Sequence, residues 1–186
     1  MELKGKEIFV RMLEVGDAPT LARLETENRD FFQAYTPLRD EAFYTVQRQQ
    51  ELLKQMEKRK ADDLEYWFGI FLAKNGELIG KITLSEVMRH HLQSCWIGYY
   101  LDKRHNGKGY MTEAVRLVVS YAFNELKLHR IEAGVMPHNL GSIQVLKKAG
   151  FHTEGINKKM CGLTENGKIM CISPSLTKKI EENNKK

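Results

Sequence analysis

The chain has 186 residues, 42% of them hydrophobic, which is enough to bury one sizeable core and predicts a single domain. No hydrophobic run is long enough to span a bilayer, and the first residues, Met1 to Lys6, lack the apolar stretch of a secretory signal, so we expect a cytoplasmic protein with no membrane partner. A formal net charge of +5 favours an anionic partner, either a phosphate-rich cofactor or an RNA-rich surface, without choosing between them.

Cysteine and histidine spacing gives no sign of a disulfide framework or a metal site. The three cysteines, Cys95, Cys161 and Cys171, are far apart, and none lies in a nucleophile signature. The six histidines are scattered without acidic residues at ligand spacing. We therefore expect reduced, space-filling thiols and no bound metal.

The first third of the chain predicts one strand and two helices. The strand spans Glu7 to Leu13, and Asp17 is a candidate N-cap for the helix that follows. A longer amphipathic helix begins near Asp40 and ends in the charged run from 57 to 63. The aromatic connection between the two helices can line a cleft or simply pack under a helix. Its candidate substrate-binding residues are Asn28, Arg29, Phe31 and Arg39.

The remainder predicts a meander followed by alternating helices and strands. Strands at 66–73 and 77–87 are joined by an Asn-Gly hairpin signal, and a third strand spans 93–102. A strongly periodic helix is predicted over 111–123 and a strand over 129–136. A further helix over 142–149 ends at Gly150. Two final strands follow Phe151 and are joined near residues 165–167. This order indicates a mixed α/β or α+β domain over residues 1–177, with a charged tail at 178–186.

The segment from Arg104 to Thr112 lies between the third meander strand and the most periodic helix. Backbone N–H groups at a helix start lack intrahelical partners, and the helix dipole is positive there, so the main chain can bind an anion. Gly107 and Gly109 permit positive φ and close approach of phosphate oxygens. The alternative, an ordinary turn at Asn106-Gly107, would be followed by a strand rather than a helix. The segment is neither a dinucleotide fingerprint nor a Walker motif.

Two motifs carry a family resemblance. Arg104-x-x-Gly107-x-Gly109 resembles the Arg/Gln-x-x-Gly-x-Gly motif of the GNAT acetyltransferases, and Asn139-x-x-Ser142 with 146–151 resembles the helix on the other side of their coenzyme. The resemblance implies a central, largely antiparallel, twisted sheet of six to seven strands with helices on both faces, and acetyl-CoA as cosubstrate. The acetyl-CoA-binding residues that it implies are Tyr100, Leu101, Arg104, Asn106, Gly107, Lys108, Gly109, Tyr110, Met111, Thr112, Asn139 and Ser142.

Further segments resemble the RimJ branch of that family. They include 27–29, 37–41, 66–71, 136–139 and 150–155. This branch acetylates the terminal alanine of a small-subunit ribosomal protein, so the resemblance implies that acceptor and no direct nucleic-acid readout. A small-molecule amine as acceptor, or a low-turnover CoA-binding or ribosome-associated protein, stays open, as does the oligomeric state, monomer or homodimer.

The family transfers acetyl directly from thioester to amine, which implies roles for a few residues. The N–H of Leu101 is a candidate donor to the thioester oxygen. Many relatives have a tyrosine as general acid where this chain has Leu146, so Ser142 is the nearest candidate acid, although serine is also a favoured N-cap. Glu86 is a candidate base or a solvated strand end. Glu113 can orient the loop.

Overall fold

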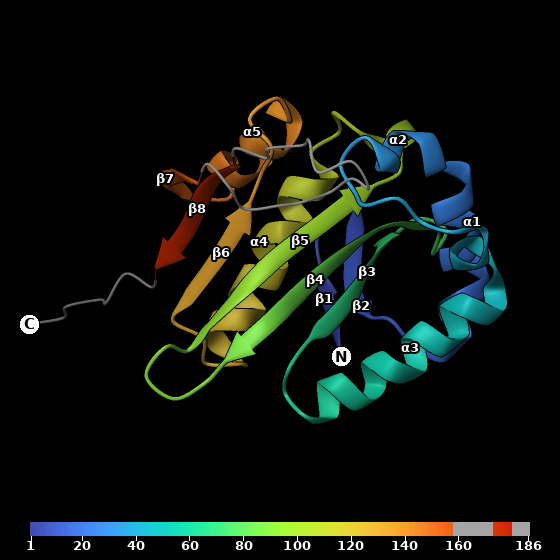
Figure 1. The fold of residues 1–186 in the computed structure, drawn as a ribbon, viewed down its shortest axis with the longest axis horizontal. Coiled ribbons are helices and arrows are strands. Elements are labelled where there is room, and N and C mark those ends of the chain that lie inside the picture. Colours follow the sequence, from blue (N-terminus) through green and yellow to red (C-terminus); the bar gives the residue numbers. More distant parts are fainter. Residues whose placement is uncertain (158–172, 180–186) are drawn as a thin grey trace, which may run out of the picture.

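The computed structural model describes residues 1–157 and 173–179, which form an eight-stranded sheet with helices on both faces (Figure 1). The strand order is β1-β2-β3-β4-β5-β6-β8-β7, and among these strands the β5–β6 pair is parallel while the other pairs are antiparallel. The expected mixed α/β class and mostly antiparallel sheet are confirmed. The sheet has one strand more than the seven predicted, because the short β1, Glu2–Lys4, adds an edge to β2.

The other elements follow the predicted order. The strands are β2 (Ile8–Met12), β3 (Tyr66–Leu72), β4 (Leu78–Met88), β5 (Ser94–Leu101), β6 (Arg130–Gly134), β7 (His152–Asn157) and β8 (Ser173–Lys179). The helices are α1 (Ala18–Glu27), α2 (Arg29–Gln33), α3 (Val46–Ala61), α4 (Tyr110–Asn124) and α5 (Leu140–Lys148). The predicted junction near 165–167 and residues 180–186 of the predicted tail lie outside the described residues, and Lys178 and Lys179 belong to β8.

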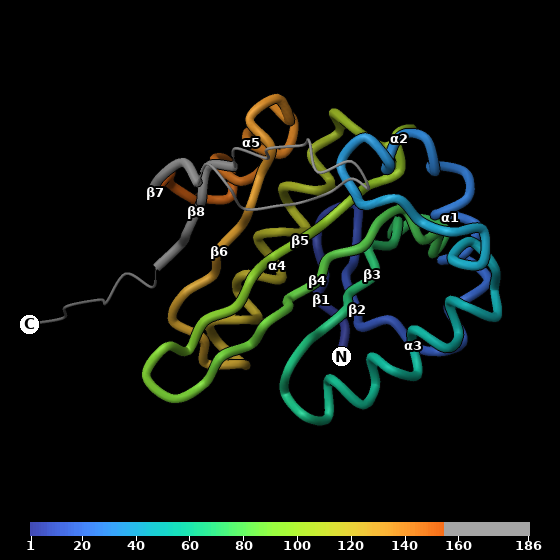
Figure 2. Tube along the Cα trace, in the orientation of Figure 1, coloured from blue at the N-terminus to red at the C-terminus, as the bar shows by residue number. Residues whose placement is uncertain are grey.

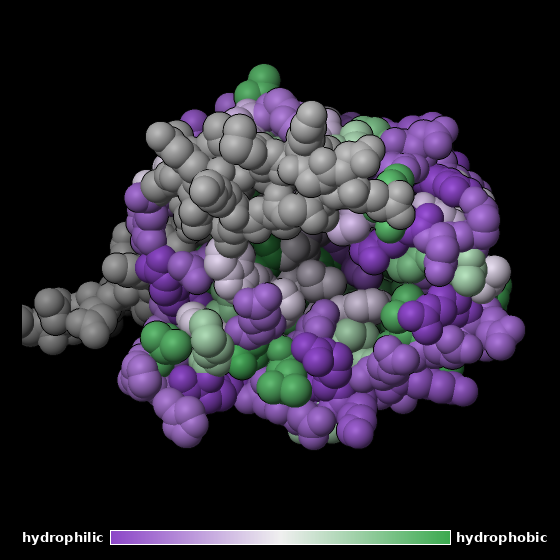
Figure 3. Space-filling view, viewed as in Figure 1, coloured by the Kyte–Doolittle hydropathy of each residue, from purple (hydrophilic) through white to green (hydrophobic). Residues whose placement is uncertain are grey.

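Alternating side chains on β3 explain why both faces of the sheet are covered. Phe68, Ile70 and Leu72 join the core under α4, whereas Trp67 and Phe71 join a second core with α1 and α3. Figure 2 traces α1 and α3 beside one another, where they contact extensively, apart from α4. The outer face of α3 is polar, as the hydrophilic surface over this part of Figure 3 shows. No helix among the described residues could cross a membrane.

Local signals explain the helix ends. Thr45 caps α3 by accepting a hydrogen bond from the N–H of Arg48, and the preceding residues 41–44 form a 3-10 turn rather than the predicted start of the helix. Gly76, at φ 70°, closes the predicted hairpin between β3 and β4. Cys95 is buried, which raises the pKa of its thiol to about 12 and makes it a poor nucleophile; Cys161 and Cys171 lie outside the described residues.

Candidate active site

The sheet opens between β5 and β6. Among the described residues, β6 pairs with β5 only from Ser94 to Trp96, whereas β4 stays paired with β5 as far as Leu101. The two strands therefore run together at their start and diverge (Figure 1). The N–H of Asp102 donates to Ile79 of β4, and because successive N–H groups of an extended chain point to opposite sides, the N–H of Leu101 points into the opening.

The loop before α4 has the backbone geometry that an anion site needs. Gly107 and Gly109 have φ of 78° and 86°, and a Cβ added at either would meet no atom within 4 Å. Gly109 is the N-cap of α4, and no side chain of the described residues caps this helix start. The start of α4 therefore lies on a cavity without a side-chain cap from the described residues, so its N–H groups and the helix dipole are available to an anion. Residues 106 and 107 themselves form a turn, but a helix and not a strand follows the loop, as the anion-site interpretation expects.

This helix start borders the first cavity, of about 620 Å³. Its wall combines the end of β5, the loop, the start of α4, the start of α5, and aromatic residues from α2 and the segment after it. Tyr35 stacks against His138 with ring centroids 6.0 Å apart, so the α2 side and the α5 side meet across the cavity. Predicted acetyl-CoA-binding residues that line it are Tyr100, Leu101, Asn106, Gly107, Gly109, Tyr110, Met111, Thr112, Asn139 and Ser142.

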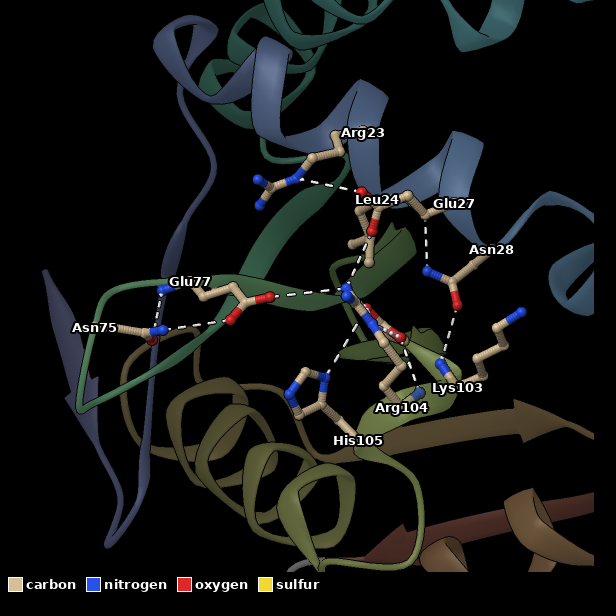
Figure 4. A network of polar contacts seen from close by, with 10 residues as sticks. Arg23, Leu24, Glu27, Asn28, Asn75, Glu77, Lys103, Arg104 and His105 are labelled. Atoms are coloured by element: carbon tan, nitrogen blue, oxygen red, sulfur yellow. Dashed lines mark hydrogen bonds and ion pairs between the residues drawn. The ribbon is translucent and has the colours of Figure 1, made fainter.

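Arg104 and Lys108, which the motif also implies, are not among the lining residues of this cavity in the described chain. The guanidinium of Arg104 instead binds the buried carboxylate of Asp102 and lies 3.0 Å from Glu27 and 3.8 Å from Glu77 (Figure 4). Burial would raise the pKa of Asp102, but hydrogen bonds from Arg104 outweigh it and lower that pKa. The observed position of Arg104 fixes the loop to α1 and to the hairpin; its contact with phosphate stays a prediction.

Asn28 is a second anchor of the same loop. Its side chain is buried, donates to the carbonyl of Leu24 at 3.0 Å and accepts from the N–H of Lys103 at 3.0 Å (Figure 4). Both ends of the amide are thus occupied within the protein. The observed contacts tie α1 to the loop, and binding of substrate by Asn28 stays a prediction.

Ser142 contacts β5 on the wall of the first cavity, and Asn139 lies beside it on the same wall. Asn139 is the N-cap of α5, with its Oδ1 accepting from the N–H of Ser142 at 3.1 Å, so the alternative that Ser142 itself is the cap is wrong. The Ser142 hydroxyl instead lies 2.9 Å from the hydroxyl of Tyr99. Burial raises the pKa of Tyr99, which keeps its phenol protonated and able to donate.

A second cavity, of about 710 Å³, lies over β3, β4, β5 and the end of β6. The two cavities meet at residues that line both, namely Tyr35, Thr36, Tyr99, Tyr100, Asn139 and Ser142. Glu86, the predicted base, lies on the lining of the second cavity, exposed and at φ 51° in the irregular stretch that separates Ser85 from Met88.

Glu113 accepts from the N–H of Lys6 at 2.7 Å and so holds the amino-terminal segment rather than the loop.

The remaining predicted substrate-binding residues surround the cavities. Phe31 lines the first cavity, and Arg39 lines the second. Arg29 makes two hydrogen bonds to Glu41, at 2.9 and 2.5 Å, and lies over the ring of Tyr44. The prediction missed residues that the fold brings to the same place, namely Trp67, Lys81 and Tyr99. Strand alternation could have grouped Lys81 with Thr83 and Ser85, but not shown which side of the sheet they occupy.

Comparison with known proteins agrees with this geometry. Residues 7–152 match the acetyltransferase (GNAT) domain. The chain is 55% identical over 173 residues to "Probable N-acetyltransferase YjcK" of Bacillus subtilis, covering 91% of this chain and 96% of that protein. It is 32% identical over 158 residues to "[Ribosomal protein uS5]-alanine N-acetyltransferase" of Escherichia coli, covering 85% of this chain and 81% of that protein.

Solved structures give the same result. Ribosomal-protein-S5-alanine acetyltransferase from Vibrio fischeri has a TM-score of 0.91 and 27% identity, with 98% of each chain covered. Mycobacterium smegmatis RimJ, solved in complex with CoA-disulfide, has a TM-score of 0.87 and 25% identity, with 95% of this chain and 84% of that chain covered. The chain therefore belongs to the GNAT family of acetyltransferases and is an N-acetyltransferase.

Proposed function

We propose that this enzyme transfers acetyl from acetyl-CoA to the α-amine of an N-terminal alanine, and that its acceptor is a ribosomal protein. The observation that carries the proposal is the meeting of two large cavities at Tyr99, Tyr100, Asn139 and Ser142, one bordered by a helix start and the other open along the sheet. The names of the E. coli and V. fischeri relatives support the alanine acceptor.

The first cavity suits the coenzyme. Its pyrophosphate would bind to the N–H groups of residues 107–112, where the missing Cβ atoms of Gly107 and Gly109 leave room. The pantetheine arm would enter the opening between β5 and β6. There the N–H of Leu101 would donate to the acetyl oxygen and stabilise the negative charge that develops on it.

The chemistry then requires a neutral amine and a proton donor for sulfur. The amine nitrogen attacks the thioester carbon, and the carbon–sulfur bond breaks. The thiolate takes a proton from the hydroxyl of Ser142, Ser142 recovers one from Tyr99, and Tyr99 regains its proton from solvent. An α-amine has an unperturbed pKa of about 8, so losing its proton near neutrality costs only about 1.4 kcal/mol. Water or Glu86 on the lining of the second cavity can accept that proton.

The test of this acceptor is acetylation of a peptide that carries the amino-terminal sequence of ribosomal protein uS5, beginning with alanine. With acetyl-CoA, mass spectrometry should show one added acetyl group, located on the α-amine by fragmentation. The same peptide with a blocked α-amine should stay unmodified, even if it contains lysine. Acetylation of polyamines or amino acids in place of any peptide would contradict the proposed acceptor, and binding of acetyl-CoA without turnover would contradict the proposed catalysis.

A further inference from the structure

Lys81 is a buried cation that the proposed transfer chemistry does not use. It lies on β4 opposite Tyr100 of β5, on the sheet face that also carries Trp67, and it exposes only 9% of its surface. Burial lowers the pKa of its ammonium to about 8. At pH 7 about nine tenths of the molecules therefore still carry the charge.

The ammonium has aromatic neighbours but, in the described part of the chain, no hydrogen-bond acceptor. Its Nζ lies 3.5 Å from the ring centroid of Trp67 and 5.5 Å from that of Tyr100. Among residues 1–157 and 173–179, it forms neither a hydrogen bond nor an ion pair. The buried carboxylate of Glu25 attracts the ammonium electrostatically without forming an ion pair with it, and this carboxylate accepts a hydrogen bond from the hydroxyl of Tyr100. The side chain is largely buried, but it lines two cavities, so the unused donors of its ammonium are open to an acceptor supplied by water or by a ligand.

Lys81 borders a side pocket of about 180 Å³, which we define by its lining residues Glu25, Arg39, Phe43, Trp67, Lys81 and Tyr100. This volume suits one amino-acid side chain, and the aromatic rings would pack against methylene groups. Arg29 also lines the pocket, but Glu41 neutralises it. Arg39 lies over the ring of Phe43 and has no ion pair among the described residues. The two remaining cations of the pocket, Arg39 and Lys81, are therefore opposed by one carboxylate, that of Glu25. The pocket therefore has a positive excess.

The side pocket adjoins the point of transfer. Tyr100 lines it and both large cavities, and Arg39, Trp67 and Lys81 are shared with the second cavity. If the amine of the acceptor lies near Ser142, the part of the acceptor that enters the side pocket is therefore a group attached close to that amine. A cationic group would be repelled by Lys81 and Arg39, and an apolar group would leave the ammonium unpaired.

We propose that the side pocket binds a carboxylate of the acceptor through Lys81 and Arg39. The inference rests on the proposed function: in a peptide that begins with alanine, the carboxylate belongs to an aspartate or glutamate at the second or third residue. Lys81 is then a specificity-determining residue, which selects acidic sequences next to the reactive amine.

The test compares alanine-starting peptides that carry Glu, Gln or Lys at position two, and separately at position three. At one of these positions the wild type should have a kcat/KM about 10- to 100-fold higher for Glu than for Gln, as one charge-assisted hydrogen bond allows, and the lowest value for Lys. Lys81→Met keeps most of the side-chain volume and should reduce the Glu/Gln ratio to near one. Lys74→Met, an exposed lysine in the β3–β4 turn, should leave that ratio unchanged.

Equal kcat/KM values for the Glu and Gln peptides at both positions in the wild type would overturn the inference. A preference for Glu that survives in folded Lys81→Met would also overturn it. If no peptide is acetylated, the proposed function fails and an unreactive probe decides the inference separately. Glutarate and the uncharged glutaramide are titrated into the enzyme while the fluorescence of Trp67 and Trp96 is followed. Glutarate should bind at least 10-fold more tightly, and less tightly to Lys81→Met; equal affinities would overturn the pocket's assignment.

Discussion

Gly109→Val should weaken acetyl-CoA binding by about 100-fold or more while the protein stays folded. Valine at φ 86° is strained, so the backbone must leave the left-handed region, and the N–H groups at the start of α4 then lose their common direction. The loss of two charge-assisted hydrogen bonds to the pyrophosphate accounts for that factor. Gly107→Val, at φ 78°, should act in the same way. Calorimetric titration with acetyl-CoA measures both.

Gly76→Val is the matched control. Gly76 also has a positive φ, 70°, with no atom within 4 Å of an added Cβ, but it lies in the β3–β4 turn and not on the first cavity. It should carry a similar backbone strain, on the order of 1–3 kcal/mol, and keep its affinity for acetyl-CoA. Unchanged affinity in both loop variants would refute the anion site, and an equal loss in Gly76→Val would assign the effect to general destabilisation.

Ser142→Ala should lower kcat by about 100-fold and leave the affinity for acetyl-CoA nearly unchanged. The hydroxyl of Ser142 is the one that the structure places against Tyr99 at the junction of the two large cavities, and a positioned general acid contributes roughly this factor or more. Pre-steady-state release of free thiol, followed with a chromogenic disulfide, separates the chemical step from product release.

Tyr99→Phe provides the comparison, since it keeps the ring and removes the hydroxyl that bonds Ser142. Because Tyr99 acts through Ser142, its loss should reduce kcat less than Ser142→Ala, and the double variant should be no slower than Ser142→Ala alone. Additive losses would show that the two hydroxyls act independently. Full activity in Ser142→Ala would leave water as the proton donor.

The sequence was most informative where chemistry depends on the backbone. The glycines at 107 and 109, followed by a strongly periodic helix, predicted a helix start preceded by positive-φ glycines, because this geometry needs no distant partner; anion binding there stays a prediction. The order of strands and helices was likewise predictable from periodicity. The short β1 was not, since three residues carry too little pattern.

Contacts between distant segments could not be predicted in the same way. The side chain of Arg104 depends on Glu27 and Glu77, which α1 and the β3–β4 turn bring together, so the motif alone did not give its direction. Asn28 and Lys103 are 75 residues apart, and Tyr99 and Ser142 are 43 apart. Lys81 is buried only because α1, the aromatic connection after α2 and the sheet enclose it, and no local signal in β4 reveals that cover.

The most direct test of the account is a crystal structure of the enzyme with acetyl-CoA. It should show pyrophosphate oxygens bound to the N–H groups of residues 107–112, the acetyl oxygen bound to the N–H of Leu101, and the sulfur facing the hydroxyl of Ser142. The acetyl group should lie where the first and second cavities meet. A coenzyme that leaves the α4 start empty, or one whose thioester lies away from Leu101 and Ser142, would contradict the account.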